Sequence, residues 1–207
     1  MSEITAITPQ VKDKTRCNVY VDGRFCCGLT LETAVKNRLK VGMVISPETL
    51  SAMQLESEKD TALDKALLHV STTRKTEKQV RDFLMQKGYL ADVIEYVLEK
   101  MRGYNFVNDG EYAEAYVESL GAKKGVRLMK MELKSKGVDD TQIDAAFSGM
   151  DERAQLDGAS ALLGKYMRGK TADRETLAKA FRYLMGKGFE YDVAKSALTA
   201  FGELDED

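Results

Sequence analysis

The chain has 207 residues, enough for one or two domains with a substantial core. Hydrophobic residues make up 43% of it and charged residues 31%, with only two prolines, a composition typical of a soluble protein rich in helix. The net charge of −2 excludes a simple polycation, so any affinity for nucleic acid must come from local segregation of charge.

Cysteine usage predicts a cytoplasmic protein, because three cysteines, an odd number, without a signal peptide indicate a reducing compartment. No run of about 18 apolar residues is present, which excludes a membrane-spanning helix. Cys17, Cys26, Cys27 and His69 could form a zinc site on ligand count alone. The Cys-x-x-Cys spacing typical of zinc sites is absent, so we expect no metal and no cofactor.

Residues 1–46 are predicted to form a small α+β module that contains a β-hairpin. We expect residues 1–15 to be polar and irregular, and weakly ordered at the very start. Alternating apolar and polar residues predict a hairpin over Arg16–Leu29, with Asp22-Gly23 as its two-residue turn.

The sequence also predicts which residues of this module lie opposite one another and where its short helix and last strand fall. Tyr20 should lie opposite Phe25, and the adjacent Cys26 and Cys27 should point to opposite sides of their strand. Thr30 can cap a short helix over Leu31–Leu39, and Val41–Ile45 is predicted to form another short strand. The apolar side of that helix would carry Ala34, Val35 and Leu39.

A long helix is predicted to begin at Ser46-Pro47 and to run over Glu48–Val70, because serine caps helices and proline favours their first position. Its polar first half could act as a spacer that holds the hairpin module away from the rest. Its second half has apolar spacing suited to packing, with Leu63, Ala66, Leu67 and Val70.

The rest of the chain repeats with a period near 50 residues. A Lys-Gly pair recurs at Lys87-Gly88, Lys136-Gly137 and Lys187-Gly188, each followed by an apolar residue, which predicts a helix C-terminus with a left-handed glycine. The next helix in each copy could be capped by Asp92, Thr141 or Asp192.

Each copy contains three helical segments, so the predicted fold is mainly α, with three tandem three-helix repeats in an elongated curved array. The linking helix and repeat 1 would occupy 47–108, repeat 2 would occupy 109–150, and repeat 3 with an acidic tail would occupy 151–207. We expect the tail, Glu203–Asp207, to be frayed.

A cationic stripe occurs in the first two copies. Basic residues fall at the same spacings of four and three, beside an apolar stripe formed by Val80 and Leu84 or by Val126, Met129 and Leu133. The basic positions are Arg74, Lys78 and Arg81 in the first copy, and Lys123, Arg127 and Lys130, extended by Lys134, in the second. Copy three keeps Arg174 but has Ala178 and Phe181 at the other positions, so the fold does not require the stripe.

An anionic partner is the simplest explanation of the stripe, although a single solvated helix face would look the same. A nucleic-acid backbone and an acidic protein surface would both fit. The stripe lacks interleaved Asn or Gln to read base edges, so sequence-specific recognition is not expected. Tyr104, Tyr112 and Tyr116 could stack on bases, but the positions of Tyr112 and Tyr116 favour core packing.

Catalysis finds little support in the sequence. His69 is the only histidine and has no evident partner along the chain. Asp139-Asp140 and Asp109-Gly110-Glu111 could bind a metal, but turns and helix starts use the same residues. No phosphate-binding glycine loop or Ser-His-Asp arrangement is present, so we expect a protein that is not an enzyme.

Three segments resemble the central signature of the bacterial RecX family of regulators: Tyr104–Val117, Gly125–Leu128 and Glu132–Val138. The resemblance covers about residues 60–200. It implies a monomeric protein that binds the RecA recombinase filament on single-stranded DNA, along its helical groove. Such a protein would inhibit strand exchange, ATP turnover and co-protease activity, and so modulate DNA repair and the SOS response.

The family's basic positions correspond to Lys123, Lys124, Arg127, Lys130 and Lys134, and also to Arg74, Lys78 and Arg81. Two features depart from the family pattern: Asn108-Asp109 stands where two acids are usual, and the third repeat lacks the stripe. Two alternatives remain open. One is a helical-repeat protein that binds nucleic acid without a recombinase partner, and the other is a scaffold that uses its acidic tail and apolar faces.

Overall fold

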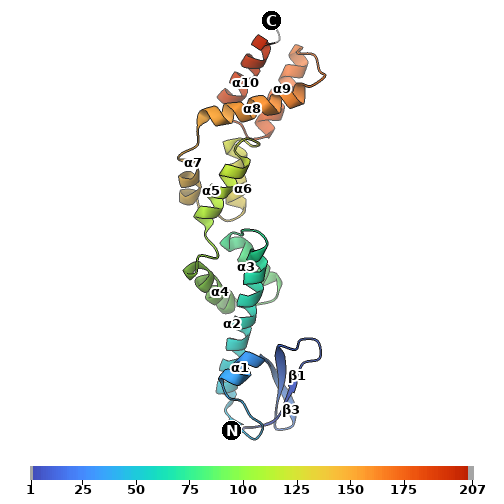
Figure 1. Ribbon diagram of the computed structural model, residues 1–207, viewed down its shortest axis with the longest axis vertical. Helices are drawn as coiled ribbons and strands as arrows, with labels where there is room; N and C mark the ends of the chain where they lie inside the picture. The colour runs from blue at the N-terminus through green and yellow to red at the C-terminus, as the bar shows by residue number, and fades with distance from the viewer. Residues whose placement is uncertain (1, 205–207) are drawn as a thin grey trace. The chain divides into compact units, whose positions relative to one another are not determined.

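The N-terminal strands form one antiparallel sheet in the order β3-β2-β1-β4 in the computed structural model, which describes residues 2–204 (Figure 1). Its strands are β1 (Ser2–Pro9), β2 (Arg16–Val21), β3 (Arg24–Thr30) and β4 (Val44–Ile45). The predicted hairpin is confirmed: Asp22 and Gly23 both have positive φ, 50° and 80°, as a tight turn requires. Tyr20 pairs with Phe25 across it, edge to face with ring centroids 5.9 Å apart.

The expectation of an irregular segment before the hairpin is wrong. Strand β1 lies inside the sheet, pairing with β2 on one side and with β4 on the other. Its Ile4 is fully buried in the sheet core. A register shift between Ile4 and Ala6 interrupts the alternation of its side chains, and its second partner, β4, is distant in sequence, so its local pattern did not indicate a strand. The expectation for the very start of the chain falls in part on Met1, outside the described residues.

The short helix α1 (Leu31–Lys36) begins as predicted, because the Thr30 side chain accepts a hydrogen bond from the Thr33 amide. The helix ends sooner than expected, since Arg38 has a φ of 51°. Ala34 is buried, but Val35 is 77% exposed, so its assignment to the apolar side is wrong. Strand β4 spans only two residues because Gly42, with a φ of 85°, turns the chain just before it.

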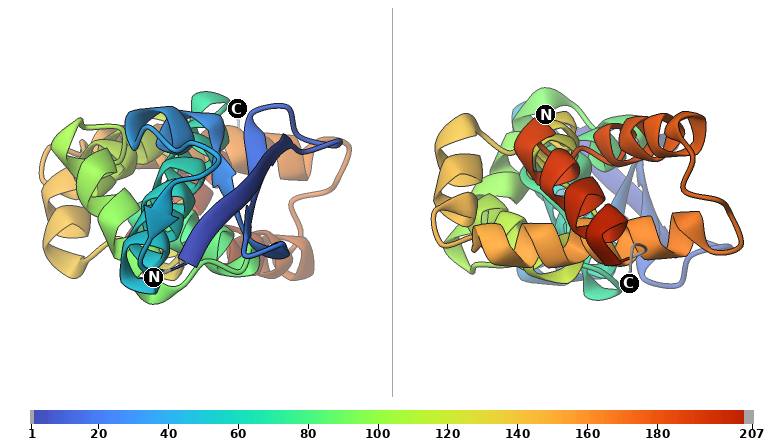
Figure 2. Two further views of the ribbon diagram at one scale, coloured as in Figure 1. Left: turned by 90° about the horizontal axis from the view of Figure 1, so that it is seen from below. Right: turned by 90° about the horizontal axis from the view of Figure 1, so that it is seen from above.

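Helix α2 (Pro47–Ser71) is one continuous helix capped by Ser46, as predicted. Its first half is not a spacer, because it packs on the sheet (Figure 2, left), where Leu50 and Met53 join the core. The Ser57 hydroxyl accepts a hydrogen bond from the Thr30 amide at 2.7 Å. The first half of α2 is polar in most positions, but its few buried residues lie on one side and pack against the hairpin module.

The second half of α2 combines with α3 (Glu77–Gln86) and α4 (Ala91–Gly103) as the first three-helix repeat. The second repeat contains α5 (Asp109–Leu120), α6 (Val126–Ser135) and α7 (Asp140–Phe147). The third contains α8 (Glu152–Met167), α9 (Arg174–Gly186) and α10 (Tyr191–Leu204), with α10 crossing α8 (Figure 2, right). The protein is thus mainly helical, with three tandem three-helix repeats after a small strand-containing module. The expected acidic tail falls mostly on residues 205–207, outside the described residues.

The chain divides into two compact units. Unit 1 extends through Arg74 and resumes over Val80–Val107, so it holds the sheet and most of the first repeat. Unit 2 comprises Lys75–Gln79 and the chain from Asn108 onward. Each repeat has its own buried cluster, centred on residues such as Leu84, Leu133 and Leu184.

The Lys-Gly turns are confirmed as helix C-termini. Gly88, Gly137 and Gly188 have φ values of 86°, 90° and 85°, a region open to glycine at little cost. The apolar residue after each glycine returns a backbone hydrogen bond to the helix, and Val138 and Phe189 are buried.

The expected caps of the following helices are wrong, because α4 and α10 begin one residue before Asp92 and Asp192, which therefore lie in the first turn. In repeat 2 the cap is Asp139, whose carboxylate accepts from the Thr141 and Gln142 amides, so Thr141 is not the cap.

Within unit 2, the second and third repeats meet through their backbones. The Gly125 amide donates to the Lys187 carbonyl at 2.9 Å, and the Arg127 amide donates to the Gly188 carbonyl at 3.1 Å. A Cβ on Gly125 would lie 2.0 Å from the Phe189 nitrogen, so only glycine permits this approach. The buried Gln155 side chain adds a 2.8 Å hydrogen bond to the Gly121 carbonyl.

Candidate partner-binding surface

The second helices of repeats 1 and 2, α3 and α6, have the predicted buried apolar side. Val80, Leu84, Met129 and Leu133 are fully buried, and Val126 is half-buried. Each stripe is shorter than predicted, however. Arg74 precedes α3 and Lys123 precedes α6, so neither lies on the helix. Thr76 and Gln79 exchange hydrogen bonds as a capping pair that starts α3 after Arg74.

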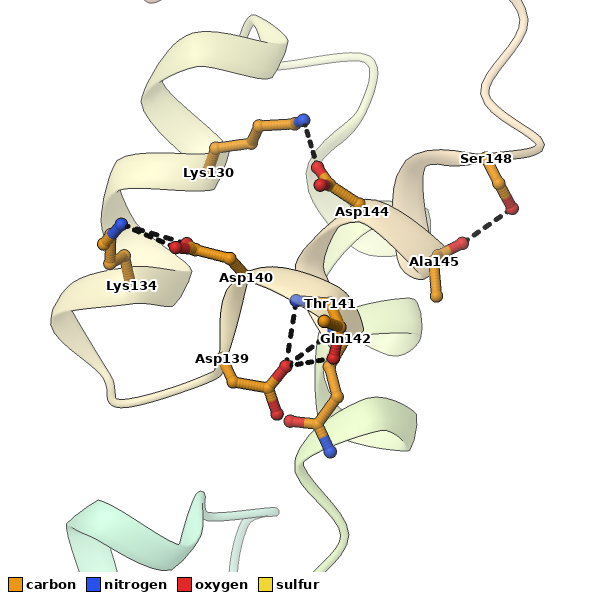
Figure 3. Close-up of polar contacts among 9 residues, drawn as sticks. All are labelled: Lys130, Lys134, Asp139, Asp140, Thr141, Gln142, Asp144, Ala145 and Ser148. Atoms are coloured by element: carbon orange, nitrogen blue, oxygen red, sulfur yellow. Dashed lines mark hydrogen bonds and ion pairs between the residues drawn. The ribbon is translucent and has the colours of Figure 1, made fainter.

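One ion pair occurs at the same place in both repeats. Arg81 on α3 contacts Glu95 on α4, and Lys130 on α6 lies 2.7 Å from Asp144 on α7 (Figure 3). In each case 14 residues separate the partners. The third repeat has Phe181 and Lys195 at these positions, and Phe181 instead packs edge to face on Tyr191. The recurring cation therefore joins the second and third helices of its own repeat.

A further ion pair extends this pattern along α6. The ammonium group of Lys134 lies 3.0 Å from both carboxylate oxygens of Asp140 (Figure 3). Both side chains are largely exposed, so the pair contributes little to stability and can exchange partners readily. The surface of α6 and α7 thus presents cations and carboxylates together.

Lys124 belongs to a half-buried polar cluster inside the second repeat. Its Nζ lies 2.6 Å from both oxygens of Glu132, and the Tyr116 hydroxyl donates to the same carboxylate. Burial acts to raise the pKa of Glu132, but the hydrogen bonds from Lys124 and Tyr116 outweigh it and leave that pKa lowered. The hydrogen bond with Glu132 raises the pKa of Lys124. Lys124 therefore stabilises its own repeat.

The other predicted positions are exposed. Arg127 on α6 donates from Nη2 to the Met185 carbonyl at 2.8 Å, at the end of α9. Lys78 on α3 is exposed. Arg74 and Lys123 are exposed and form no ion pair within the part of the chain that the structure describes.

Sequence reasoning missed an aromatic contact at the Lys-Gly turns. In each repeat the lysine of this pair lies near the face of a ring, with centroid distances of 5.5 Å for Lys87, 6.0 Å for Lys136 and 5.4 Å for Lys187. These distances suit cation–π attraction. The rings are Phe83, Tyr112 and Tyr183, and they stack on His69, Tyr116 and Tyr166, respectively.

Aligning the sequences of the three repeats does not reveal this contact, because the ring lies on the second helix in repeats 1 and 3 but on the first helix in repeat 2. The expectation that Tyr112 and Tyr116 pack against the core is confirmed. Tyr104 is 70% exposed and lies beside Phe106.

The cysteines alternate as predicted, with Cys27 buried and Cys26 exposed, while Cys17 is also buried. Among the side chains that the structure describes, no three His, Cys, Asp or Glu residues are grouped so that they could hold a metal ion. Asp109, one of the carboxylates considered as a ligand, accepts a hydrogen bond from the Glu77 amide at 2.8 Å. No helix among the described residues is long and apolar enough to span a membrane.

Four family models match successive parts of the chain. The Regulatory protein RecX N-terminal domain matches residues 2–46. The first, second and third three-helix domains of RecX match residues 62–101, 108–146 and 154–198.

Individual proteins agree with these matches. The chain is 33% identical over 200 residues to a Regulatory protein RecX of Clostridium perfringens, covering 95% of this chain and 94% of that protein. It is 31% identical over 202 residues to one from Bacillus velezensis, covering 96% of this chain and 77% of that protein. A crystal structure of regulatory protein RecX superposes with a TM-score of 0.71 at 25% identity, covering 94% of this chain and 98% of the other. RecX from Lactobacillus salivarius gives 0.63 at 26% identity, over 72% of this chain and 98% of the other.

The fold and the surface define a tandem three-helix-domain protein in which the second and third helices of the first two repeats together present charges of both signs. The chain belongs to the RecX family of regulatory proteins.

Proposed function

We propose that this protein regulates a RecA-type recombinase by binding its filament on single-stranded DNA and inhibiting its recombinase, ATPase and co-protease activities. Through these activities it would modulate homologous recombination, DNA repair and the SOS response in the bacterial cytoplasm. The observation that carries the proposal is family membership over nearly the whole chain, with each of the four family domains present in order.

The α6–α7 surface supports a protein partner in particular. Arg127, Lys130 and Lys134 lie along α6, and two of them already face Asp144 and Asp140. A bare phosphate backbone would be repelled by these carboxylates, whereas a folded protein presents charges of both signs. The exposed ion pairs can open at little cost, so each lysine can contact an acidic group of the partner.

Several weak contacts would act together in this binding. Each repeat offers its own exposed residues, and a filament repeats the same partner surface from protomer to protomer, so the separate contacts add to the affinity. A monomer bound along the filament would hinder the movements between protomers that accompany ATP turnover. Inhibition of this kind is steric and requires no catalytic residue.

The test is an ATPase titration of recombinase on single-stranded DNA with the wild type and with Arg127→Glu. We expect the wild type to inhibit at stoichiometric ratios and the variant to need about tenfold more protein, which corresponds to ~1.4 kcal/mol. Arg182→Glu is the matched control, because Arg182 is also an exposed arginine that donates to a carbonyl of unit 2, that of Ala178, but lies off the stripe. No effect of the wild type at stoichiometric ratios would refute the proposal.

The second candidate function is binding of nucleic acid without a recombinase partner, favoured by the ring–lysine contacts at the Lys-Gly turns. Sedimentation of the protein with recombinase–DNA filaments and with DNA alone separates the two functions. Equal co-sedimentation in both would favour the second function.

A further inference from the structure

A cavity of about 410 Å³ lies in unit 1 between the end of α2 and α3. Its lining contains two stacked rings, His69 and Phe83, whose centroids are 4.1 Å apart and whose planes differ by 3°. Leu68, which is 72% exposed, and Thr72 also line it. The cavity therefore combines a flat aromatic surface with an open, accessible rim.

The charge of this cavity has one sign. Lys65 and Lys87 line it, and no acidic residue does. By contrast, the 570 Å³ cavity over α6 and α7 in unit 2 is lined by Arg127, Lys130 and Lys134 together with three carboxylates, Asp140, Asp144 and Glu190. Of these two cavities, the one whose cations are not compensated by carboxylates is thus not on the stripe that the sequence indicates.

The two lysines are held without carboxylates. Lys87 Nζ lies 5.5 Å from the centroid of the Phe83 ring, and Lys65 Nζ lies 3.0 Å from the Tyr89 hydroxyl. Over the described residues neither lysine forms an ion pair. Their charges are therefore positioned by aromatic groups and remain available to an anion.

We propose that this cavity is a binding site for single-stranded nucleic acid, in which a base packs against the His69–Phe83 rings and the flanking phosphates contact Lys65 and Lys87. Stacking platforms flanked by cations bind single strands in this way, and tolerate any sequence because every base has a π-face. No Asn, Gln, Asp or Glu lines the cavity to read a base edge, which agrees with sequence-independent binding. An acidic protein segment is a weaker candidate, because carboxylate groups would not stack on the parallel ring pair.

This inference deepens the proposed function by naming a DNA contact in unit 1 that is separate from the stripe. It is tested without recombinase, so either proposal can fail alone. The assay measures fluorescence anisotropy of a labelled single-stranded oligothymidylate with the full-length wild type and with the double variant Lys65→Gln/Lys87→Gln.

We expect the double variant to weaken binding about tenfold and to flatten the plot of log affinity against log salt by about 0.7 for each lysine. His69→Ala should weaken binding without changing that slope, because it removes stacking and no lysine. The matched control is Lys59→Gln/Lys100→Gln. These lysines of the same unit also lie over a ring, that of Tyr96 at 4.7 and 5.7 Å, but do not line the cavity.

Equal losses in the two double variants would overturn the proposal, because general electrostatics would then explain the binding. Unchanged binding in the cavity variant would overturn it as well. So would a cavity variant that loses affinity for polyglutamate but keeps its affinity for DNA, since this result would assign the site to an acidic protein. Circular dichroism confirms that each variant is folded before its affinity is compared.

Discussion

Lys130 on α6 reaches Asp144 on α7, with 2.7 Å between Nζ and Oδ1. The same contact joins Arg81 to Glu95 one repeat earlier. The recurrence gives part of the cationic stripe a role inside the fold, because an ion pair links the second and third helices in each of the first two repeats. The positive charge of the stripe is therefore partly neutralised by carboxylates of the third helices. These carboxylates, like the cations, are expected to affect the binding of an anionic partner.

Removing these carboxylates should strengthen binding to an acidic partner. In Asp140→Asn/Asp144→Asn, Lys134 and Lys130 lose their intramolecular partners, and we expect inhibition of the filament ATPase at about threefold lower protein concentration. The measurement is the ATPase titration at low salt, with Asp157→Asn, an exposed aspartate on α8, as the control. Weaker inhibition by the double variant would show that the partner uses the carboxylates instead.

Sequence patterns predicted the features that depend on neighbouring residues. The turn at Asp22-Gly23, the cap at Ser46 and the three left-handed glycines all follow from local geometry. Strand β1 does not, because a register shift between Ile4 and Ala6 interrupts its alternating pattern and its partner β4 is far away in sequence.

The same limit applies to the candidate site. Helical spacing located Lys130 correctly on α6, but Asp144 lies on a different helix, so only the fold reveals their pairing. The Lys-Gly lysines were visible as a repeat, yet the rings beneath them come from different helices in different repeats.

The cluster of Glu132, Lys124 and Tyr116 should make stability depend on pH. The pKa of Glu132 is lower in the folded protein than in an unfolded chain, so its contribution is present above the unfolded pKa and is lost as pH falls through the folded pKa. We expect Glu132→Gln to lower the free energy of unfolding by about 1–2 kcal/mol at pH 7. The deficit should shrink as the pH falls through the acidic range.

Urea unfolding followed by circular dichroism at neutral and acidic pH measures this difference. Glu118→Gln is the control, since Glu118 is exposed on α5 of the same repeat and lies outside the cluster. A Glu132→Gln deficit that stays constant with pH would contradict the assignment of the effect to this carboxylate.

The cysteines provide a test of the N-terminal sheet. Cys26 is exposed and should react rapidly with a thiol reagent at mildly alkaline pH, whereas burial raises the pKa of the neighbouring Cys27 to about 11. One equivalent of thiol should therefore react fast in the native protein, and all three should react in denaturant. Cys26→Ser should abolish the fast phase. Rapid labelling of Cys17 or Cys27 in the native variant would mean that the sheet core is open.

The backbone junction between the second and third repeats should tolerate no side chain at Gly125. This glycine has ordinary extended backbone angles, φ −75° and ψ 157°, so alanine would suit its conformation. The obstacle is contact, because the new Cβ would lie 2.0 Å from the Phe189 nitrogen and 2.2 Å from the Gly188 oxygen. We expect Gly125→Ala to lower the free energy of unfolding by about 3 kcal/mol through overpacking and loss of the junction hydrogen bonds.

Gly164→Ala is the matched control, since Gly164 lies inside α8 and a Cβ there meets nothing within 4 Å. It should stabilise the protein by about 0.5–1 kcal/mol, because alanine loses less backbone entropy than glycine in a helix. Urea unfolding of both variants at neutral pH gives the comparison. If Gly125→Ala unfolded like the wild type, the two repeats would not meet through this backbone contact, and Arg127 would lose the fixed position that its hydrogen bond to Met185 gives it.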